Sequence, residues 1–255
     1  VSYLYYADRV TQLPLGVVGV AVGTALLPLL ARQLKAGEDR AAQNSQNRGL
    51  EFALLLTLPA AAACLVIPDE IIRVLFERGA FGAEATAATA SALFAYATGL
   101  PAYVLVRVLA PGFYAREDTS TPVRIAIAAM VVNIVLMLAL MKPMGHVGIA
   151  LAASASAWLN TLLLAVVLVR RGHFALDARL RARLPRILLA TAGMVGVLEI
   201  TRQNVGFLMT GTTAQQVLGL VLLVALGLTA FTALALVLRA AGLKDAKSML
   251  KARDL

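Results

Sequence analysis

Long apolar runs, separated by short charged connections, make up almost the whole chain. A transmembrane helix needs about 20 mostly apolar residues, and seven runs reach or approach that length. They cover residues 13–31, 52–68, 85–106, 125–141, 147–169, 187–200 and 217–238. None alternates as a half-buried strand does, and a backbone exposed to lipid satisfies its own hydrogen bonds as a helix. The pattern therefore predicts an all-α integral membrane protein, a polytopic helical bundle of about seven transmembrane helices.

The basic residues in the connections indicate how these helices are oriented. Under a seven-helix arrangement, 17 Lys and Arg residues fall on one side of the membrane and five on the other. Cytoplasmic connections carry the excess of Lys and Arg, so we expect a cytoplasmic carboxy terminus. Arg107 belongs to neither group, because it lies within the end of an apolar run.

The composition argues against nucleic-acid binding and excludes intrachain disulfides. The chain is 60% hydrophobic and 15% charged, with a mean hydropathy of +0.81. The net charge of +9 does not predict nucleic-acid binding, because the basic residues flank apolar runs and few aromatic residues lie among them. Cys64 is the single cysteine, so intrachain disulfides are excluded, and we expect it to be a small buried apolar residue.

Enzyme and metal signatures are missing from the sequence. It has no HExxH, GxSxG or P-loop pattern. His146 and His173 fall at opposite membrane faces in the seven-helix arrangement, so they cannot share a metal. The adjacent acidic pairs, Asp69–Glu70 and Glu117–Asp118, each have Arg neighbours that favour ion pairing. We expect a protein that is not an enzyme and that has no metal site and no cofactor.

Two amphipathic segments are too polar to span a bilayer. Residues 69–79 combine a candidate capping residue, Asp69, with an apolar stripe at Ile71, Ile72, Leu75 and Phe76. We expect this segment to lie on the outer membrane surface, with Asp69 and Arg73 paired at i,i+4 and Gly79 ending the helix. Residues 243–255 predict a basic helix on the cytoplasmic face.

Charged residues near the membrane interior are functional candidates. Asp8 and Arg9 come just before the first apolar run, and Pro14 predicts a kink there. Arg9 beside a cavity would suit an anionic headgroup, whereas an interfacial Arg beside Tyr5 and Tyr6 would be purely structural. The residue types alone leave both interpretations open.

Arg107 is a second candidate, because it follows 22 uncharged residues. Its depth favours a cavity over the interface. Asn133 and Asn160 are polar residues within the fourth and fifth runs, where hydrogen bonds between helices are the simpler explanation; Asn133 is also a candidate binding residue. Gly16, Gly19 and Gly23 form a small-residue stripe that predicts close helix packing.

Three stretches resemble one family of membrane exporters. They are YYADRVTQLPLGVVGVAVGTALLPLLAR (residues 5–32), LFERGAF (75–81) and GLPAYVLVRVLAPGFYAREDTSTPVRIA (99–126). On these residues the chain is similar to the MurJ/MviN family of lipid II flippases, within the multidrug/oligosaccharidyl-lipid/polysaccharide exporter superfamily. Beyond about residue 148 the resemblance rests on hydropathy and topology.

The resemblance implies the second half of a fourteen-helix exporter in the bacterial inner membrane. Residues 1–145 would then supply cavity-forming helices, and residues 146–255 the remaining helices and a cytoplasmic tail, within one membrane domain. Val1 is not an initiator Met, and residues 1–6 resemble the end of an earlier segment. We therefore expect a fragment whose amino-terminal half is missing and which flips nothing alone.

The resemblance also implies a function. Family members move lipid II, an undecaprenyl-pyrophosphate-linked peptidoglycan precursor, from the cytoplasmic to the periplasmic leaflet by alternating access. Arg9 matches the family's cavity arginine, Asp8 would orient it, and Arg107 stands where many relatives have Lys. Expected partners are lipid II, membrane lipids and cell-wall synthesis proteins, without nucleic acid.

Three alternatives stay open on the sequence alone. An exporter of another lipid-linked oligosaccharide or of an amphipathic drug would use the same fold. A membrane enzyme acting on polyprenyl phosphates would require metal-binding acidic clusters, which the sequence does not offer. A noncatalytic scaffold would tolerate Ala at Arg9 and Arg107.

Overall fold

The computed structural model describes residues 2–240, without the side chains at positions 17 and 20–24, and these residues form helices and their connections, with no strand. The α-helices are α1 (Ser2–Lys35), α2 (Asp39–Val66), α3 (Pro68–Phe76), α4 (Ala83–Leu109), α5 (Pro111–Tyr114), α6 (Ser120–Arg170), α7 (Ala178–Val205) and α8 (Thr213–Val237). A 3₁₀-helix, η1 (Gly206–Thr210), separates α7 from α8. The predicted all-α class is confirmed.

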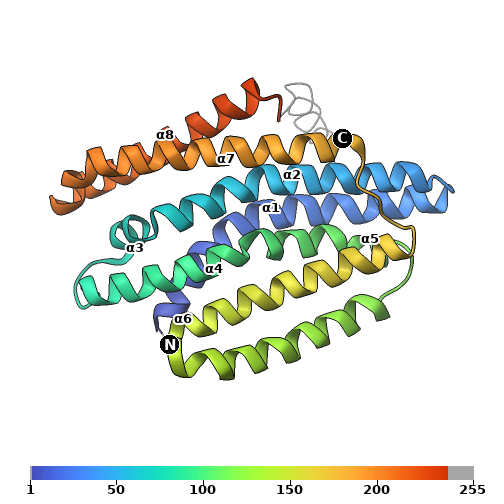
Figure 1. Cartoon of the computed structure of the whole chain (residues 1–255), viewed down its shortest axis with the longest axis horizontal. Helices are drawn as coiled ribbons and strands as arrows, with labels where there is room; N and C mark the ends of the chain where they lie inside the picture. The colour runs from blue at the N-terminus through green and yellow to red at the C-terminus, as the bar shows by residue number, and fades with distance from the viewer. Residues whose placement is uncertain (1, 241–255) are drawn as a thin grey trace. The chain divides into compact units, whose positions relative to one another are not determined.

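Each predicted apolar run lies in a helix, apart from the last one or two residues of the second and seventh runs. By length and composition, five helices could cross a membrane: α2, α4 with α5, α6, α7 with η1, and α8. α6 carries two of the runs in its 51 residues, and the backbone breaks between them at Gly145, where φ is 57° and ψ is −131°. Figure 1 shows α6 doubling back on itself. With α6 counted as two passes and α1 carrying the first run, the prediction of about seven helices agrees with the structure.

The chain divides into two compact units, residues 1–177 and 178–255. In the first unit α4 packs against α1, α2, α3 and α6, and in the second α7 packs against α8 and η1. The predicted division at residue 145 separates cavity-forming helices from the remaining ones and is not a division by packing. It stays a prediction.

Small residues on α4 allow its neighbours to approach closely. Ala92, Ala95, Ala97 and Ala102 are fully buried. At Gly99 an added Cβ would lie 2.7 Å from the backbone Cα of Ser154 in α6, so the two helices touch there through backbone atoms. Helices in lipid associate through such close packing, because lipid tails are as apolar as the side chains themselves.

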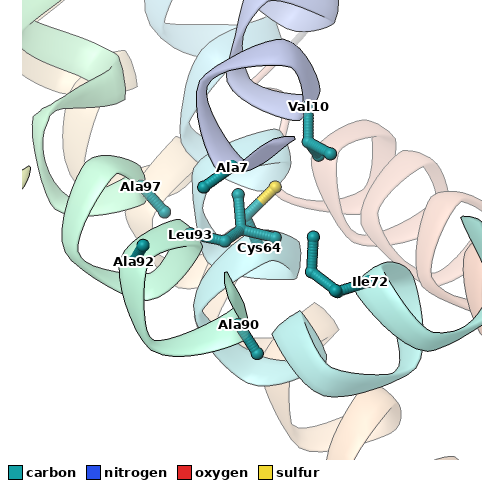
Figure 2. Packing of buried hydrophobic residues seen from close by; sticks show 8 residues of the cluster. All are labelled: Ala7, Val10, Cys64, Ile72, Ala90, Ala92, Leu93 and Ala97. Carbon is teal, nitrogen blue, oxygen red and sulfur yellow. The ribbon is translucent and has the colours of Figure 1, made fainter. Parts of the chain in front are cut away.

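A buried cluster joins α1, α2, α3 and α4 at one end of the first unit. It contains Ala7, Val10, Cys64, Ile72, Ala90, Ala92, Leu93 and Ala97, which Figure 2 shows converging from the four helices. Cys64 is buried there without a disulfide, as the sequence predicts.

The prediction that the apolar stripe of α3 lies on the membrane is wrong for most of the stripe, whereas the place of α3 at the membrane surface stays a prediction. Ile72 is fully buried, and Ile71 and Phe76 pack against the same cluster, whereas Leu75 remains exposed. The helix begins at Pro68 without a side-chain cap and ends at Phe76. Its apolar stripe packs largely on protein. The sequence pattern could not show this, because a protein interior and lipid are both apolar surroundings. The predicted helix at residues 243–255 lies outside the described residues.

The predicted pairing within this segment is also different. Arg73 pairs with Glu77 at 3.4 Å, one turn towards the carboxy terminus from the expected position. An i,i+4 pair in which the acid follows the base therefore takes the place of the Asp69–Arg73 pair.

Candidate functional site

A cavity of about 410 Å³ lies between α1, α4 and both halves of α6. Its lining comprises Leu15 from α1, Tyr103, Val106 and Arg107 from α4, Ala126, Ala129, Met130 and Asn133 from the first half of α6, and Ala153, Ser156, Ala157 and Asn160 from the second half. No carboxylate belongs to this lining, so its formal charge comes from Arg107 alone.

Helical spacing explains why these side chains share one space. Tyr103 and Arg107 are four residues apart, and in each half of α6 the lining residues follow an i, i+3, i+4, i+7 spacing. Residues at these separations lie on one face of a helix. The reversal at Gly145 then turns the Asn133 face and the Asn160 face towards the same cavity.

Arg107 is exposed in this cavity and lies across the backbone of α1. An added Cβ at Gly19 would lie 2.5 Å from one terminal guanidinium nitrogen of Arg107. Within residues 2–240 the guanidinium has no hydrogen-bond or ion-pair partner. A cation at membrane depth without a protein partner is available to bind an anion.

The two amides of the cavity do not join helices as predicted. Neither Asn133 nor Asn160 makes a hydrogen bond with another described residue, and the side-chain oxygen of Asn160 is buried without a partner. Buried polar atoms are nearly always satisfied. The expectation of interhelical hydrogen bonds is therefore wrong for both residues, although both line the cavity.

Arg9 and Asp8 are not among the residues that line this cavity. Arg9 is exposed on α1, donates a hydrogen bond to the Oε1 atom of Gln12 at 3.2 Å, and lies 4.8 Å from the ring centroid of Tyr5. The Oδ2 atom of Asp8 accepts a hydrogen bond from the side-chain Nε2 of the same Gln12. Gln12 thus bridges the two residues, which make no direct ion pair.

Arg9 and Arg107 lie at different positions along α1, because Arg107 contacts this helix at Gly19. The helix continues through Pro14 and Pro28, and Figure 1 shows that it is bent. Arg9 and Gly19 are ten residues apart, which corresponds to about 15 Å along a helix axis. Arg9 and Arg107 therefore mark two separate positions along α1.

The polar lining of the cavity consists of one cation and neutral side chains. Within the described part of the chain, no group of three or more His, Cys, Asp or Glu side chains could hold a metal ion. The arrangement supports anion binding by a guanidinium, with amides and hydroxyls beside it.

Comparison with known proteins identifies the family. The family model described as "Lipid II flippase MurJ" matches residues 1–214. The chain belongs to the lipid II flippase MurJ family. This MurJ match covers both halves of α6 and every residue that lines the cavity.

Individual MurJ relatives agree with this assignment. A Rhizobium tropici protein named "Probable lipid II flippase MurJ" is 48% identical over 230 residues, which cover 89% of this chain and 43% of that protein. The "Lipid II flippase MurJ" of Burkholderia cenocepacia is 36% identical over 174 residues, 68% of this chain and 34% of the relative. A solved "Lipid II flippase MurJ, inward closed conformation" superposes with a TM-score of 0.76 at 26% identity, covering 93% of this chain and 47% of that one. The chain thus spans less than half the length of these MurJ proteins.

Some residues of the cavity were missed by the sequence interpretation. Asn160 was assigned to helix packing, and Tyr103 and Ser156 were not singled out. Ser156 is buried and donates a hydrogen bond to the carbonyl oxygen of Ala153. The i,i+4 spacing of Ser156 and Asn160 in an otherwise apolar run was the available signal.

Proposed function

We propose that this chain contributes the cation-bearing cavity of a lipid II flippase. In this proposal the pyrophosphate and sugars of an undecaprenyl-pyrophosphate-linked peptidoglycan precursor enter the cavity, and alternating access carries them from the cytoplasmic to the periplasmic leaflet. The observation that carries the proposal is Arg107, an unpaired guanidinium in an acid-free cavity between apolar helices.

The chemistry of the cavity suits this substrate. A pyrophosphate leaves water only where donors replace its hydration, and a guanidinium donates two parallel hydrogen bonds to phosphate oxygens. Asn133 and Asn160 line the same cavity as Arg107, and amide groups there would suit the sugar hydroxyls. The polyprenyl chain can remain among lipid tails while the headgroup moves.

Arg9 would provide a second cationic position along the same helix. Its guanidinium is exposed and held over Tyr5, and Gln12 connects it to Asp8. We propose that Arg9 contacts the headgroup at a different depth from Arg107, with Asp8 acting on its orientation only through Gln12. The same geometry also suits an interfacial anchor, so the test includes both arginines.

Location and partners follow from the proposed reaction. The helices described here would cross the bacterial inner membrane several times, with the basic connections in the cytoplasm. Enzymes that make lipid II on one face and polymerise it on the other would then be neighbours of the transporter.

The test uses a chimera in which this chain replaces the matching segment of the Rhizobium tropici relative. The chimera is expressed in a bacterium depleted of its own lipid II flippase, and growth is measured. We expect rescue by the chimera and loss of rescue in Arg107→Ala and Arg9→Ala. Arg40→Ala is the matched control, because Arg40 is exposed outside the apolar runs.

The outcomes separate the competing functions. Rescue by Arg9→Ala at the parental level would make Arg9 an interfacial anchor. A chimera that is inserted in the membrane but cannot rescue, while the intact relative does, would contradict lipid II transport. Vesicles loaded with other undecaprenyl-linked oligosaccharides would then test the broader exporter function.

A further inference from the structure

Gly19 and Arg107 are in a contact that no residue larger than glycine would permit. A Cβ built on Gly19 would lie 2.5 Å from a terminal guanidinium nitrogen, 2.7 Å from Cδ and 3.1 Å from Cζ of Arg107. Separations under 3 Å lie inside van der Waals contact. The side chain of Arg107 therefore lies over bare backbone of α1.

Cβ atoms built on Gly99, Gly112 and Gly148 of the same unit would also lie within 3 Å of a neighbouring residue, but the atoms they meet belong to the uncharged residues Ser154, Gln46 and Leu140. Gly16, one turn before Gly19 on α1, has nothing within 4 Å of its built Cβ. Gly49 faces the methyl groups of Leu26 and Val108, which is ordinary packing between apolar helices. Gly19 instead faces the one charged side chain of the cavity.

The guanidinium of Arg107 has no described polar partner, so its contact with Gly19 helps to determine where its charge lies. Within residues 2–240 no carboxylate or carbonyl oxygen holds the guanidinium of Arg107 by a hydrogen bond. Its placement in the cavity then depends on packing, and among the described contacts Gly19 of α1 lies directly beneath it. A methyl group there would displace the flexible end of an arginine and leave the α1 and α4 backbones in place.

We propose that Gly19 is a positioning residue that seats the guanidinium of Arg107 at the depth and angle where it meets an anionic headgroup. This inference rests on the proposed function of the cavity and deepens it. The sequence alone explains Gly19 by helix packing. In this inference Gly19 also acts on the substrate indirectly, through the charge of Arg107 on α4.

The transport test compares four variants of the chimera reconstituted in vesicles with lipid II. Loss of a hydrogen-bonded charge lowers binding by about ten- to a hundredfold, so we expect that scale of loss in Arg107→Ala. Gly19→Ala should lose several-fold, and Gly16→Ala, the matched control, should equal the parent. Adding Gly19→Ala to Arg107→Ala should cause no further loss, because Gly19 acts through Arg107.

A second readout does not depend on transport. Phenylglyoxal modifies arginine, and peptide mass spectrometry can follow its reaction at Arg107. We expect Gly19→Ala to change the rate of modification of Arg107 several-fold, whereas Gly16→Ala leaves it unchanged. The elution profile in detergent should be the same for all variants, since the substitution moves a side chain and not a helix.

The results distinguish this inference from the proposed function. An unchanged modification rate in Gly19→Ala would overturn the positioning role, as would an equal additional loss in the Arg107→Ala background. Parental transport by Arg107→Ala would overturn the function proposed for the cavity, while a changed modification rate would still support the contact.

Discussion

The imidazole Nε2 atom of His146 lies 2.8 Å from the backbone carbonyl oxygen of Ala88. A carbonyl oxygen only accepts, so Nε2 carries the proton. His146 directly follows the reversal of α6 at Gly145, and its ring centroid lies 5.6 Å from that of Tyr3. One side chain therefore connects α6, α4 and α1 at the same end of the first unit.

Replacing His146 tests how much this connection stabilises the unit. A hydrogen bond contributes about 1 kcal/mol and an aromatic pair about 0.5–1.5 kcal/mol, so His146→Ala should lower the unfolding free energy by about 1–2 kcal/mol. His146→Phe keeps a ring and should lose roughly half as much. Thermal unfolding of the chimera in detergent measures both. Equal losses in the two variants would show that the ring contributes nothing.

The contact between Gly99 and Ser154 should be far less tolerant of added volume. A Cβ at Gly99 would meet the Oγ, Cβ and backbone Cα atoms of Ser154 at 2.6–2.7 Å, and backbone cannot move aside as a side chain does. Ser154 also donates to the carbonyl oxygen of Ala95 at 2.8 Å. Gly99→Ala should therefore destabilise the chimera by about 1–3 kcal/mol.

Gly196→Ala is the control for Gly99→Ala. Gly196 is an exposed helical glycine with nothing within 4 Å of its built Cβ. Alanine there should be neutral or stabilising by up to about 1 kcal/mol. Similar unfolding temperatures for the two variants would contradict the close approach of α4 and α6.

Much of the fold could be predicted because a bilayer imposes a length on every crossing helix. The two runs inside α6 were separated correctly, since four of the five residues between them are polar or helix-breaking, namely Lys142, Pro143, Gly145 and His146. Whether an apolar helix face contacts lipid or protein could not be predicted. Ile72 was assigned to lipid and packs on protein, because hydropathy does not distinguish the two.

The cavity was predicted only in part for a related reason. Arg107 and Asn133 were found because each interrupts an apolar run, but their common location depends on how α4 and α6 turn about their axes. α6 is apolar on all sides, so its sequence does not show which face meets α4. Gly19 could not be linked to Arg107 from the sequence, since 88 positions separate them and only packing brings them together.

The segment 172–177 should depend on α2 for its order. Gln43 donates to the carbonyl oxygen of Gly172 at 3.0 Å, Asn47 donates to that of Ala175 at 2.9 Å, and Arg48 pairs with Asp177. Arg48 also pairs with Glu51 on its own helix. Arg48→Ala would therefore remove a cation placed between two carboxylates.

We expect Arg48→Ala to accelerate hydrogen exchange of the amides at 172–177. Hydrogen bonds to charged groups contribute about 1.5–3 kcal/mol, which corresponds to roughly ten- to a hundredfold in rate. Arg40→Ala, on the exposed start of the same helix, should leave exchange unchanged. Equal protection in Arg48→Ala and the parent would show that the backbone bonds to Gln43 and Asn47 suffice.

His173 makes the stability of this region depend on pH. Burial lowers the pKa of His173, and the nearby Arg116 and Arg171 lower it further, while Asp39 and Asp118 act in the opposite direction. Its Nδ1 atom is buried without a hydrogen-bond partner. The folded state therefore favours the neutral imidazole more than the unfolded state does, where the pKa is about 6.5.

Protonation of His173 should lower the stability of the folded state. A group whose pKa is depressed by folding contributes stability that is present above its unfolded pKa and is lost as the pH falls through that value to the folded one. The unfolding temperature of the chimera in detergent should thus fall between pH 7.5 and 5.5. His173→Gln cannot titrate, so it should flatten that part of the dependence while leaving the effect of carboxylates below pH 5 intact. Parallel pH profiles for the parent and His173→Gln would show that protonation of His173 does not oppose folding.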